Sequence, residues 1–225
     1  MSLRVQIYAE GPAEDRGQTP LFGTMPGEPL AVDSLGPAHH LVGRMIEKER
    51  KIPRAAISFL APARIEAKKV QGSDLHVTKH MRQLLQAAML HEAHLAIVLV
   101  DADGDSQRRR LLTDGTQDLS VPRVIAVAVQ EFEAWLLADQ RALVDGLQVT
   151  ETPPAPESWP PGEAKQLLRR WLDDCAPTPS QVEVAEHVPT RRIAIASALD
   201  LDLLARQRSF QQFQVDLRAA LHGQP

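Results

Sequence analysis

The most informative stretch of the sequence is a run of six apolar residues, LAIVLV at positions 95–100, that ends in three aspartates. A continuous apolar run of this length is typical of a strand in a parallel sheet that is covered on both faces. A second run of this kind, VPRVIAVAVQ, occupies positions 121–130. Parallel strands need crossover connections, which are usually helices. The two runs therefore predict an α/β fold.

The patterning of the neighbouring segments agrees with this fold. Two more strands are expected because both segments are rich in strand formers, at residues 3–10 and 54–62. Helical spacing of apolar residues predicts helices at residues 37–51, 74–93, 106–112 and 131–147. Residues 17–35 carry several Gly and Pro without a period and are expected to be irregular. This order of elements is that of a Rossmann-like, mainly parallel sheet flanked by helices.

A proline-rich segment divides the chain at residues 149–162. Dense proline precludes regular secondary structure and stiffens the chain. We therefore expect an α/β domain at residues 1–148, a linker at 149–162, and a helical C-terminal extension at 163–225 packed on the same domain. Ser209 is a plausible cap for the last helix.

Composition narrows the classes of function. The formal net charge of −4 provides no global positive field, so a nucleic acid would have to be held by local basic clusters, metal ions or a partner protein. The single cysteine, Cys175, cannot form an intramolecular disulfide. The first residues lack the profile of a signal peptide, and no apolar run approaches the length of a membrane span. We expect a cytoplasmic protein with no membrane association.

Acidic residues follow two of the predicted strands. Glu10 ends the first strand, with Glu14 about one helical turn later, and Asp101, Asp103 and Asp105 end the central strand. Asp101 and Asp103 are expected to share a strand face, about 6.7 Å apart. In open α/β sheets, ligands bind beyond the carboxyl ends of the strands. Carboxylates gathered there would repel one another by about 1–4 kcal/mol per close pair. Mg²⁺ or Mn²⁺ would remove that cost, and two such ions about 4 Å apart could clamp a phosphodiester.

Simpler explanations exist for the same residues. An acidic cluster after a strand is often a solvated loop, and Asp105 suits the cap of a helix that begins near Ser106. Glu14 also suits the first turn of a helix, where acidic side chains are favoured. An EF-hand calcium loop is disfavoured because Ser106 replaces the required glycine and Leu112 replaces the terminal glutamate.

The two motifs together, YAEGPAED and then VLVDADGD, resemble the TOPRIM domain, the metal-binding module of topoisomerases, primases and the overcoming-lysogenization-defect nucleases. That family has a glutamate at the end of its first strand and a DxD motif at the end of a later strand. The form EGPAE is similar to the EGxxE version of the overcoming-lysogenization-defect group. The resemblance implies a TOPRIM-like fold and metal-ligand roles for four residues. These are Glu10, Glu14, Asp101 and Asp103.

A third segment, VAVQEFEAWLLAD at residues 127–139, resembles a bacterial family of uncharacterised TOPRIM-like proteins often carried beside ATPase genes. This resemblance implies a metal-dependent nuclease centre in a defence or DNA-processing system, with an ATPase partner. Glu131 and Glu133 would lie about 200° apart on a helix, so only one is expected to face the site. We expect Glu133 to be the ligand, Glu131 to be a charge at the helix N-terminus, and Trp135 to belong to the core.

Basic residues are candidates for stabilising negative charge. The resemblance to nucleases of the overcoming-lysogenization-defect type implies a basic residue near the metals, and Lys165 is our candidate; an exposed lysine on an amphipathic helix is the simpler alternative. Three consecutive arginines could contact phosphates or could neutralise the acidic patch by ion pairing. They are Arg108, Arg109 and Arg110. Weaker candidates of the same kind are Arg191, Arg192, Lys68 and Lys69.

The sequence gives less support to a histidine metal site or to catalysis by a nucleophilic side chain. His76 and His80 are four apart on a predicted helix but have no third ligand nearby, so we expect them on a helix surface. Cys175 has no flanking basic motif, and the chain contains no nucleophile elbow and no Walker A loop.

The leading hypothesis is a nuclease that uses Mg²⁺ or Mn²⁺ to cleave DNA or RNA. An alternative is a non-catalytic regulatory or toxin-like subunit with a degenerate site. A phosphatase of the haloacid dehalogenase type is disfavoured, because its DxD motif normally follows the first strand and carries Thr or Val where Asp105 stands.

Overall fold

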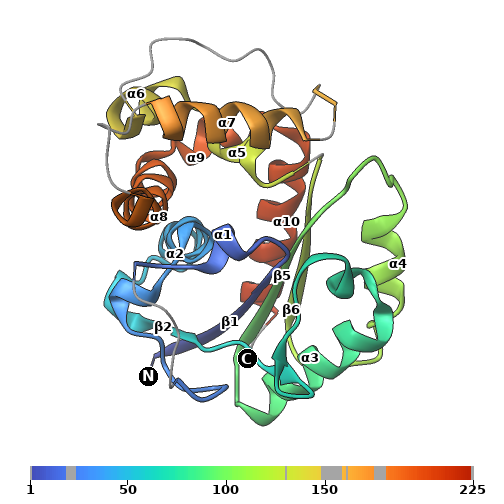
Figure 1. The fold of residues 1–225 in the computed structure, drawn as a ribbon. Helices are drawn as coiled ribbons and strands as arrows, with labels where there is room; N and C mark the ends of the chain where they lie inside the picture. Colours follow the sequence, from blue (N-terminus) through green and yellow to red (C-terminus); the bar gives the residue numbers. More distant parts are fainter. Residues whose placement is uncertain are drawn as a thin grey trace.

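A four-stranded parallel sheet in the order β2-β1-β5-β6 forms the centre of the protein (Figure 1). The computed structural model describes residues 2–18, 24–129, 131–147, 159–160, 162–174 and 181–223. The strands of the sheet are β1 (Leu3–Ala9), β2 (Ile57–Leu60), β5 (Leu95–Asp101) and β6 (Arg123–Ala128). A separate antiparallel hairpin is formed by β3 (Arg64–Ile65) and β4 (Lys68–Lys69). The predicted α/β fold with a mainly parallel sheet is confirmed.

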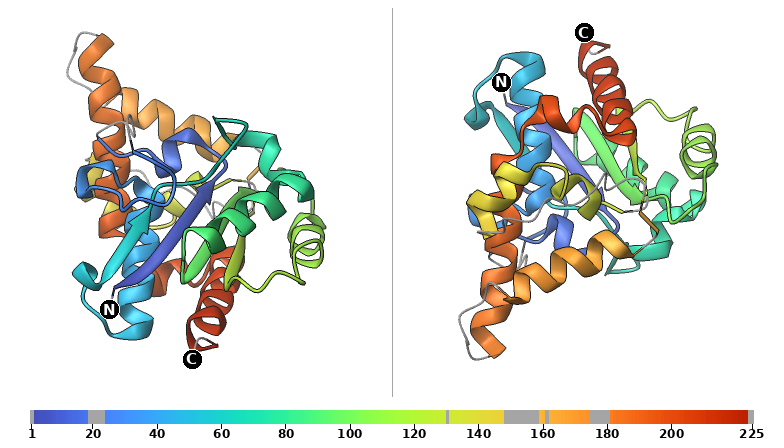
Figure 2. Two further views of the ribbon diagram at one scale, coloured as in Figure 1. Left: turned by 90° about the horizontal axis from the view of Figure 1, so that it is seen from below. Right: turned by 90° about the horizontal axis from the view of Figure 1, so that it is seen from above.

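Helices lie on both faces of the sheet (Figures 1 and 2). Those between the strands are α1 (Pro12–Asp15), α2 (Pro37–Arg50), α3 (Thr78–Leu90) and α4 (Arg108–Asp114), with short 3-10 helices η1 (Val32–Ser34), η2 (Arg54–Ala56) and η3 (Gly72–His76). Those after the sheet are α5 (Glu133–Leu136), α6 (Gln140–Leu147), α7 (Glu163–Asp174), α8 (Gln181–Ala198), α9 (Leu201–Leu204) and α10 (Arg208–His222). Within the described ranges, no helix has the length and apolar character needed to span a bilayer.

The two faces of β5 belong to two different packing layers, which explains why its sequence is apolar throughout. One layer contains α2 and the C-terminal helices, and the other contains α3 and α4 (Figure 1). The side chains facing the first layer are Leu95, Ile97 and Leu99, and those facing the second are Ala96, Val98 and Val100. Every residue of β5 is buried, as the sequence run predicts for a central parallel strand.

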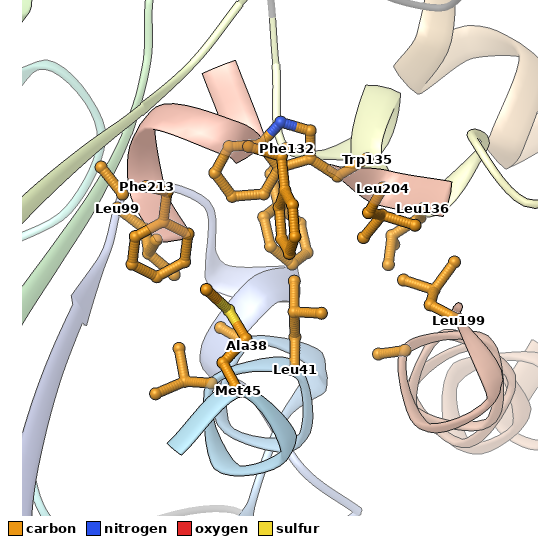
Figure 3. Close-up of a cluster of buried hydrophobic side chains, with 14 of the residues drawn as sticks. Ala38, Leu41, Met45, Leu99, Phe132, Trp135, Leu136, Leu199, Leu204 and Phe213 are labelled. Carbon is orange, nitrogen blue, oxygen red and sulfur yellow. The ribbon is translucent and has the colours of Figure 1, made fainter. Parts of the chain in front are cut away.

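The C-terminal helices complete the core on one face of the sheet (Figure 3). Trp135 is fully buried, as predicted, and stacks on Phe213 of α10 with ring centroids 5.7 Å apart. Its indole N–H donates a 2.8 Å hydrogen bond to Ser209 Oγ. The expected capping role of Ser209 is wrong, because Gln207 occupies the N-cap position of α10 and the Ser209 hydroxyl serves Trp135 instead. The helices after residue 163 therefore share the core of the α/β domain.

The helix predicted at residues 131–147 is divided into α5 and α6. Asp139 causes the break, since its Oδ1 accepts hydrogen bonds from the main-chain N–H groups of Arg141 and Ala142 and so caps α6. Its Oδ2 accepts a 2.7 Å hydrogen bond from the main-chain N–H of Asp200. Most of the predicted linker at 149–162, and Cys175, lie outside the described residues. The linker stays a prediction.

Candidate metal centre

The two acidic motifs meet at one edge of the sheet, because β1 and β5 are adjacent parallel strands. Ala9 pairs with Leu99 in the sheet register, so Glu10 and Asp101 leave their strands side by side. Glu10 Oε2 accepts a 2.8 Å hydrogen bond from the main-chain N–H of Asp101. The carboxyl ends of the strands thus place both motifs where a shared cation could reach them.

Glu14 turns back toward the end of β1 from the first turn of α1. Its Oε1 accepts a 3.1 Å hydrogen bond from the main-chain N–H of Gly11. A Cβ atom at position 11 would overlap the Glu14 carboxylate, so the glycine of the EGPAE motif leaves the space that the carboxylate occupies. Burial raises the pKa of Glu14 well above its ordinary value, and the charges of Asp101 and Glu133 raise it further.

Asp101 is the last residue of β5 and is buried. Its Oδ1 accepts a 2.9 Å hydrogen bond from the main-chain N–H of Phe132, which ties β5 to the segment before α5. Burial raises the pKa of Asp101 to about 8, and the charges of Glu133 and Glu10 contribute to the rise. A buried carboxyl with other carboxyls around it is poorly stabilised as an anion in the protein alone.

Asp103 does not share a strand face with Asp101, contrary to expectation. The strand ends at Asp101, and Asp103 lies in the following turn with φ 46°, in the left-handed region. Its side chain is half exposed and pairs with Arg108 at 3.1 Å. The turn nevertheless keeps Asp103 close to β1, since ligand atoms of Asp103, Glu10 and His76 all lie within 4.8 Å of one another.

Both glutamates that follow β6 are buried, whereas only Glu133 was expected to face the site. Glu133 Oε1 accepts a 2.8 Å hydrogen bond from the Arg192 guanidinium, while its buried Oε2 has no hydrogen-bond partner among the described residues. Glu131, expected to be a charge at the N-terminus of its own helix, instead accepts a 2.5 Å hydrogen bond from the main-chain N–H of Lys165 in the first turn of α7. Glu131 therefore attaches α7 to the edge of the sheet.

Lys165 lies beside this group of carboxylates. Partial burial alone would lower the pKa of its ammonium, but the negative charges around it outweigh that effect and raise the pKa above its ordinary value. These charges belong to Glu133, Asp101, Glu131 and Glu14. Lys165 consequently stays protonated at neutral pH and supplies positive charge to the centre.

The remaining predicted residues are not brought into the centre in the way expected. Asp105 is 42% exposed, and its Oδ1 accepts a hydrogen bond from the main-chain N–H of Gln107, as a local cap would. All three arginines form ion pairs within the chain, but only Arg108 pairs with a residue of the acidic patch, which is the second of the two alternatives considered for them. The pairs are Arg108 with Asp103 at 3.1 Å, Arg109 with Asp216 at 2.5 Å and Arg110 with Asp114 at 3.5 Å.

The sequence did not predict His76 in the centre and left the role of Arg192 open. His76 was expected on a helix surface with His80, but it ends η3 before α3 begins, and its Nε2 lies 2.8 Å from Glu10 Oε2. Arg192 was a weaker candidate for either phosphate contact or ion pairing, and it is buried and pairs with Glu133. Its position carried a signal, because Ile195 and Ala196 follow it on the buried face of α8, where a charge needs a buried partner.

The balance of charge at this edge fits a divalent cation. Among the described residues, six carboxyl groups gather there beside the cationic side chains of Lys165, Arg192 and Arg108. The carboxylates are those of Glu10, Glu14, Asp101, Asp103, Glu131 and Glu133. The buried Glu133 Oε2 has no hydrogen-bond partner among the described residues, and the raised pKa of Asp101 means that the protein alone poorly stabilises the anionic form of this carboxyl. Oxygen-only carboxylate donors suit Mg²⁺ and Mn²⁺.

The sequence matches the model of a known protein family. The family model described as Domain of unknown function (DUF4276) matches residues 39–218, which is most of the sequence. The chain belongs to this family. The matched region includes β5, which ends at Asp101, the following turn with Asp103, and α7 with Lys165. No curated protein matches the chain, and no solved structure does. Because the DUF4276 description names no activity, the resemblance to TOPRIM nucleases stays a prediction.

Proposed function

We propose that this DUF4276 protein is a divalent-metal-dependent nuclease that hydrolyses phosphodiester bonds of DNA or RNA. The observation that carries the proposal is the gathering of carboxyl groups at the carboxyl edge of the sheet, where Glu10 is hydrogen-bonded to the main chain of Asp101 and the buried Glu133 Oε2 has no hydrogen-bond partner among the described residues. Negative charge gathered in this way is costly in the protein alone and becomes favourable when a hard cation binds.

Each residue of the centre has a part in this proposal. Bound divalent cations would polarise the phosphodiester and lower the pKa of an attacking water. Glu10 and Asp101 are the central ligands, and their shared 2.8 Å hydrogen bond holds the two strand ends in register. Lys165, protonated beside the carboxylates, would neutralise negative charge that develops on the phosphate. The TOPRIM resemblance implies the same division between acidic ligands and one basic residue.

The proposal includes a partner for substrate binding. The net charge is −4, and Arg108 and Arg109 are occupied by Asp103 and Asp216. Little of the arginine cluster after β5 is thus available for a polyanion, although nucleic-acid affinity depends strongly on such contacts. An ATPase partner that delivers the nucleic acid, as the resemblance to proteins carried beside ATPase genes suggests, would supply them.

The test is cleavage of supercoiled plasmid, single-stranded DNA and RNA by the purified protein with Mn²⁺, Mg²⁺ or EDTA. We expect cleavage that needs the metal and is lost in Asp101→Asn and Glu10→Gln. Asp105→Asn is the matched control and should retain activity, because Asp105 is exposed and serves as a local cap.

Other results of this assay would support a different function for the protein. Equal cleavage by wild-type protein and Asp101→Asn would identify a contaminating nuclease. A stable protein that binds Mn²⁺ and cleaves nothing, even with an ATPase partner added, would support a regulatory subunit. Phosphate release from a small phosphomonoester, without cleavage of nucleic acid, would support a phosphatase instead.

A further inference from the structure

His76 is held against the acidic edge by its own segment. The main-chain N–H of Gly72, at the start of η3, donates a 2.8 Å hydrogen bond to the carbonyl oxygen of Glu10. Leu75 is fully buried in the second core layer and fixes the end of η3. The imidazole consequently lies beside Glu10, with Nε2 2.8 Å from Glu10 Oε2 and only 21% of the side chain exposed.

We propose that His76 supplies a nitrogen ligand to a cation that it shares with Glu10 and Asp103. This inference rests on the metal dependence proposed above and identifies a ligand that neither acidic motif contains. The ligand atoms of the three residues lie within 4.8 Å of one another. A six-coordinate cation with bonds of about 2.1 Å spaces neighbouring ligands about 3 Å apart and opposite ligands about 4.2 Å apart. Two ligand atoms at the 4.8 Å limit would need to approach by about 0.6 Å to occupy opposite positions on such a cation, or by about 1.8 Å to occupy neighbouring ones.

The nitrogen ligand has a consequence for metal choice. Mg²⁺ prefers oxygen donors and is held mainly by carboxylates and water, whereas imidazole favours the transition metals. Both cations bind all-oxygen sites, but a site with two carboxylates and one imidazole disfavours Mg²⁺ more than it disfavours Mn²⁺. The protein should therefore prefer Mn²⁺ to Mg²⁺, and this preference should depend on His76.

An orienting role is the competing explanation for the same contact. His76 could donate from Nε2 to Glu10 Oε2 and merely hold that carboxylate in place. An orienting histidine and a ligand histidine would both lower metal affinity when replaced. They differ in one respect, because only a ligand places its nitrogen on the metal.

The deciding experiment is pulsed electron paramagnetic resonance of Mn²⁺ bound to the wild-type protein, with a second sample in which histidine is ¹⁵N-labelled. We expect a directly coordinated nitrogen signal that changes with the label and disappears in His76→Gln. In calorimetric titrations, His76→Gln should weaken Mn²⁺ binding by about 10–100-fold and Mg²⁺ binding by less than about threefold. His80→Gln is the control, since His80 Nδ1 faces the main-chain oxygen of Asp74 at 3.3 Å, and it should change neither affinity.

The outcomes separate the two proposals. Mn²⁺ that binds the wild-type protein without a histidine nitrogen signal overturns the ligand role of His76 and leaves the metal-dependent nuclease intact. A wild-type protein that binds no divalent cation overturns both. Because the signal is measured on the wild-type protein, the result does not depend on whether the His76 variant folds.

Discussion

Glu10 Oε2 accepts a 2.8 Å hydrogen bond from the main-chain N–H of Asp101, so two acidic motifs 91 residues apart in the chain are bonded directly. This contact exists because β1 and β5 are neighbours in the sheet and end at the same level. It places Glu10 between the buried Asp101 and the more exposed pair of His76 and Asp103.

Asp101→Asn should stabilise the metal-free protein. The pKa of Asp101 is about 8 in the folded state against an ordinary value of 3.8, so folding takes up a proton between these values. Its contribution to stability is therefore full below about pH 4 and is lost as the pH rises toward 8. Asn retains an oxygen acceptor for the Phe132 N–H and removes the charge. In urea denaturation with EDTA, the free energy of unfolding at pH 8 should rise by about 1–3 kcal/mol.

The same variant should show a flatter dependence of stability on pH between 5 and 8 than the wild type. Asp105→Asn, at an exposed position, should change the free energy of unfolding by less than about 0.5 kcal/mol. If the stability of the wild-type protein rose with pH across this window, the conclusion that Asp101 is buried among carboxyl groups that repel its charge would be wrong.

Mn²⁺ should stabilise the wild-type protein against heat, and more strongly at pH 8 than at pH 6. Glu14 and Asp101 have raised pKa values and must lose their protons before they can bind a cation. At a Mn²⁺ concentration 100 times the Kd, the gain is about 2.7 kcal/mol. Thermal denaturation at both pH values measures it, with Glu10→Gln as a variant that should lose most of the gain. A shift of equal size at both pH values would indicate a site that does not use these carboxyls.

Gly11→Ala should weaken metal binding although residue 11 offers no side-chain ligand. The backbone at Gly11 has φ −86°, which alanine adopts without strain, so the fold should persist. The added methyl group would displace the Glu14 carboxylate from its present position. We expect about a tenfold rise in the Kd for Mn²⁺ by calorimetry, with little change in the melting temperature of the metal-free protein. Unchanged affinity would show that Glu14 is no ligand.

Lys165→Met should reduce the rate of nucleic-acid cleavage by about 10²–10³-fold without weakening Mn²⁺ binding. Lys165 supplies positive charge beside the carboxylates, so its removal affects the developing phosphate charge and lessens repulsion of the metal. Arg169→Met, one turn further along α7 and highly exposed, is the matched control. Single-turnover cleavage rates and calorimetric Mn²⁺ affinities are measured for the wild type, Lys165→Met and Arg169→Met. Loss of Mn²⁺ binding in Lys165→Met would indicate that Lys165 has a structural role.

Arg192→Met should destabilise the protein by about 3–5 kcal/mol, because it leaves the buried Glu133 carboxylate without its ion-pair partner. The double variant with Glu133→Gln should recover much of that loss, since it removes the unpaired charge as well. Urea denaturation of the two single variants and the double variant gives the coupling energy. Additive losses would mean that the two side chains do not interact in solution.

The sequence was sufficient to identify the sheet and its acidic edge. Strand periodicity is local, so the apolar run before Asp101 predicted a strand buried on both faces, and the position of Glu10 after β1 followed in the same way. Because β1 and β5 run parallel, their carboxyl ends lie at the same edge of the sheet. The break between α5 and α6 was not predicted, because helical patterning does not show that Asp139 caps a second helix and accepts a hydrogen bond from Asp200.

Only the tertiary structure decided which distant side chains join the acidic residues. His76 reaches Glu10, and Arg192 reaches Glu133, through the packing of η3 and α8 on the sheet. Residue spacing gives the direction of a side chain within its own helix or strand, but contacts between elements depend on how whole faces pack together. The chain alone therefore specifies an acidic edge on a parallel sheet, and the packed fold specifies the histidine and the arginine that accompany it.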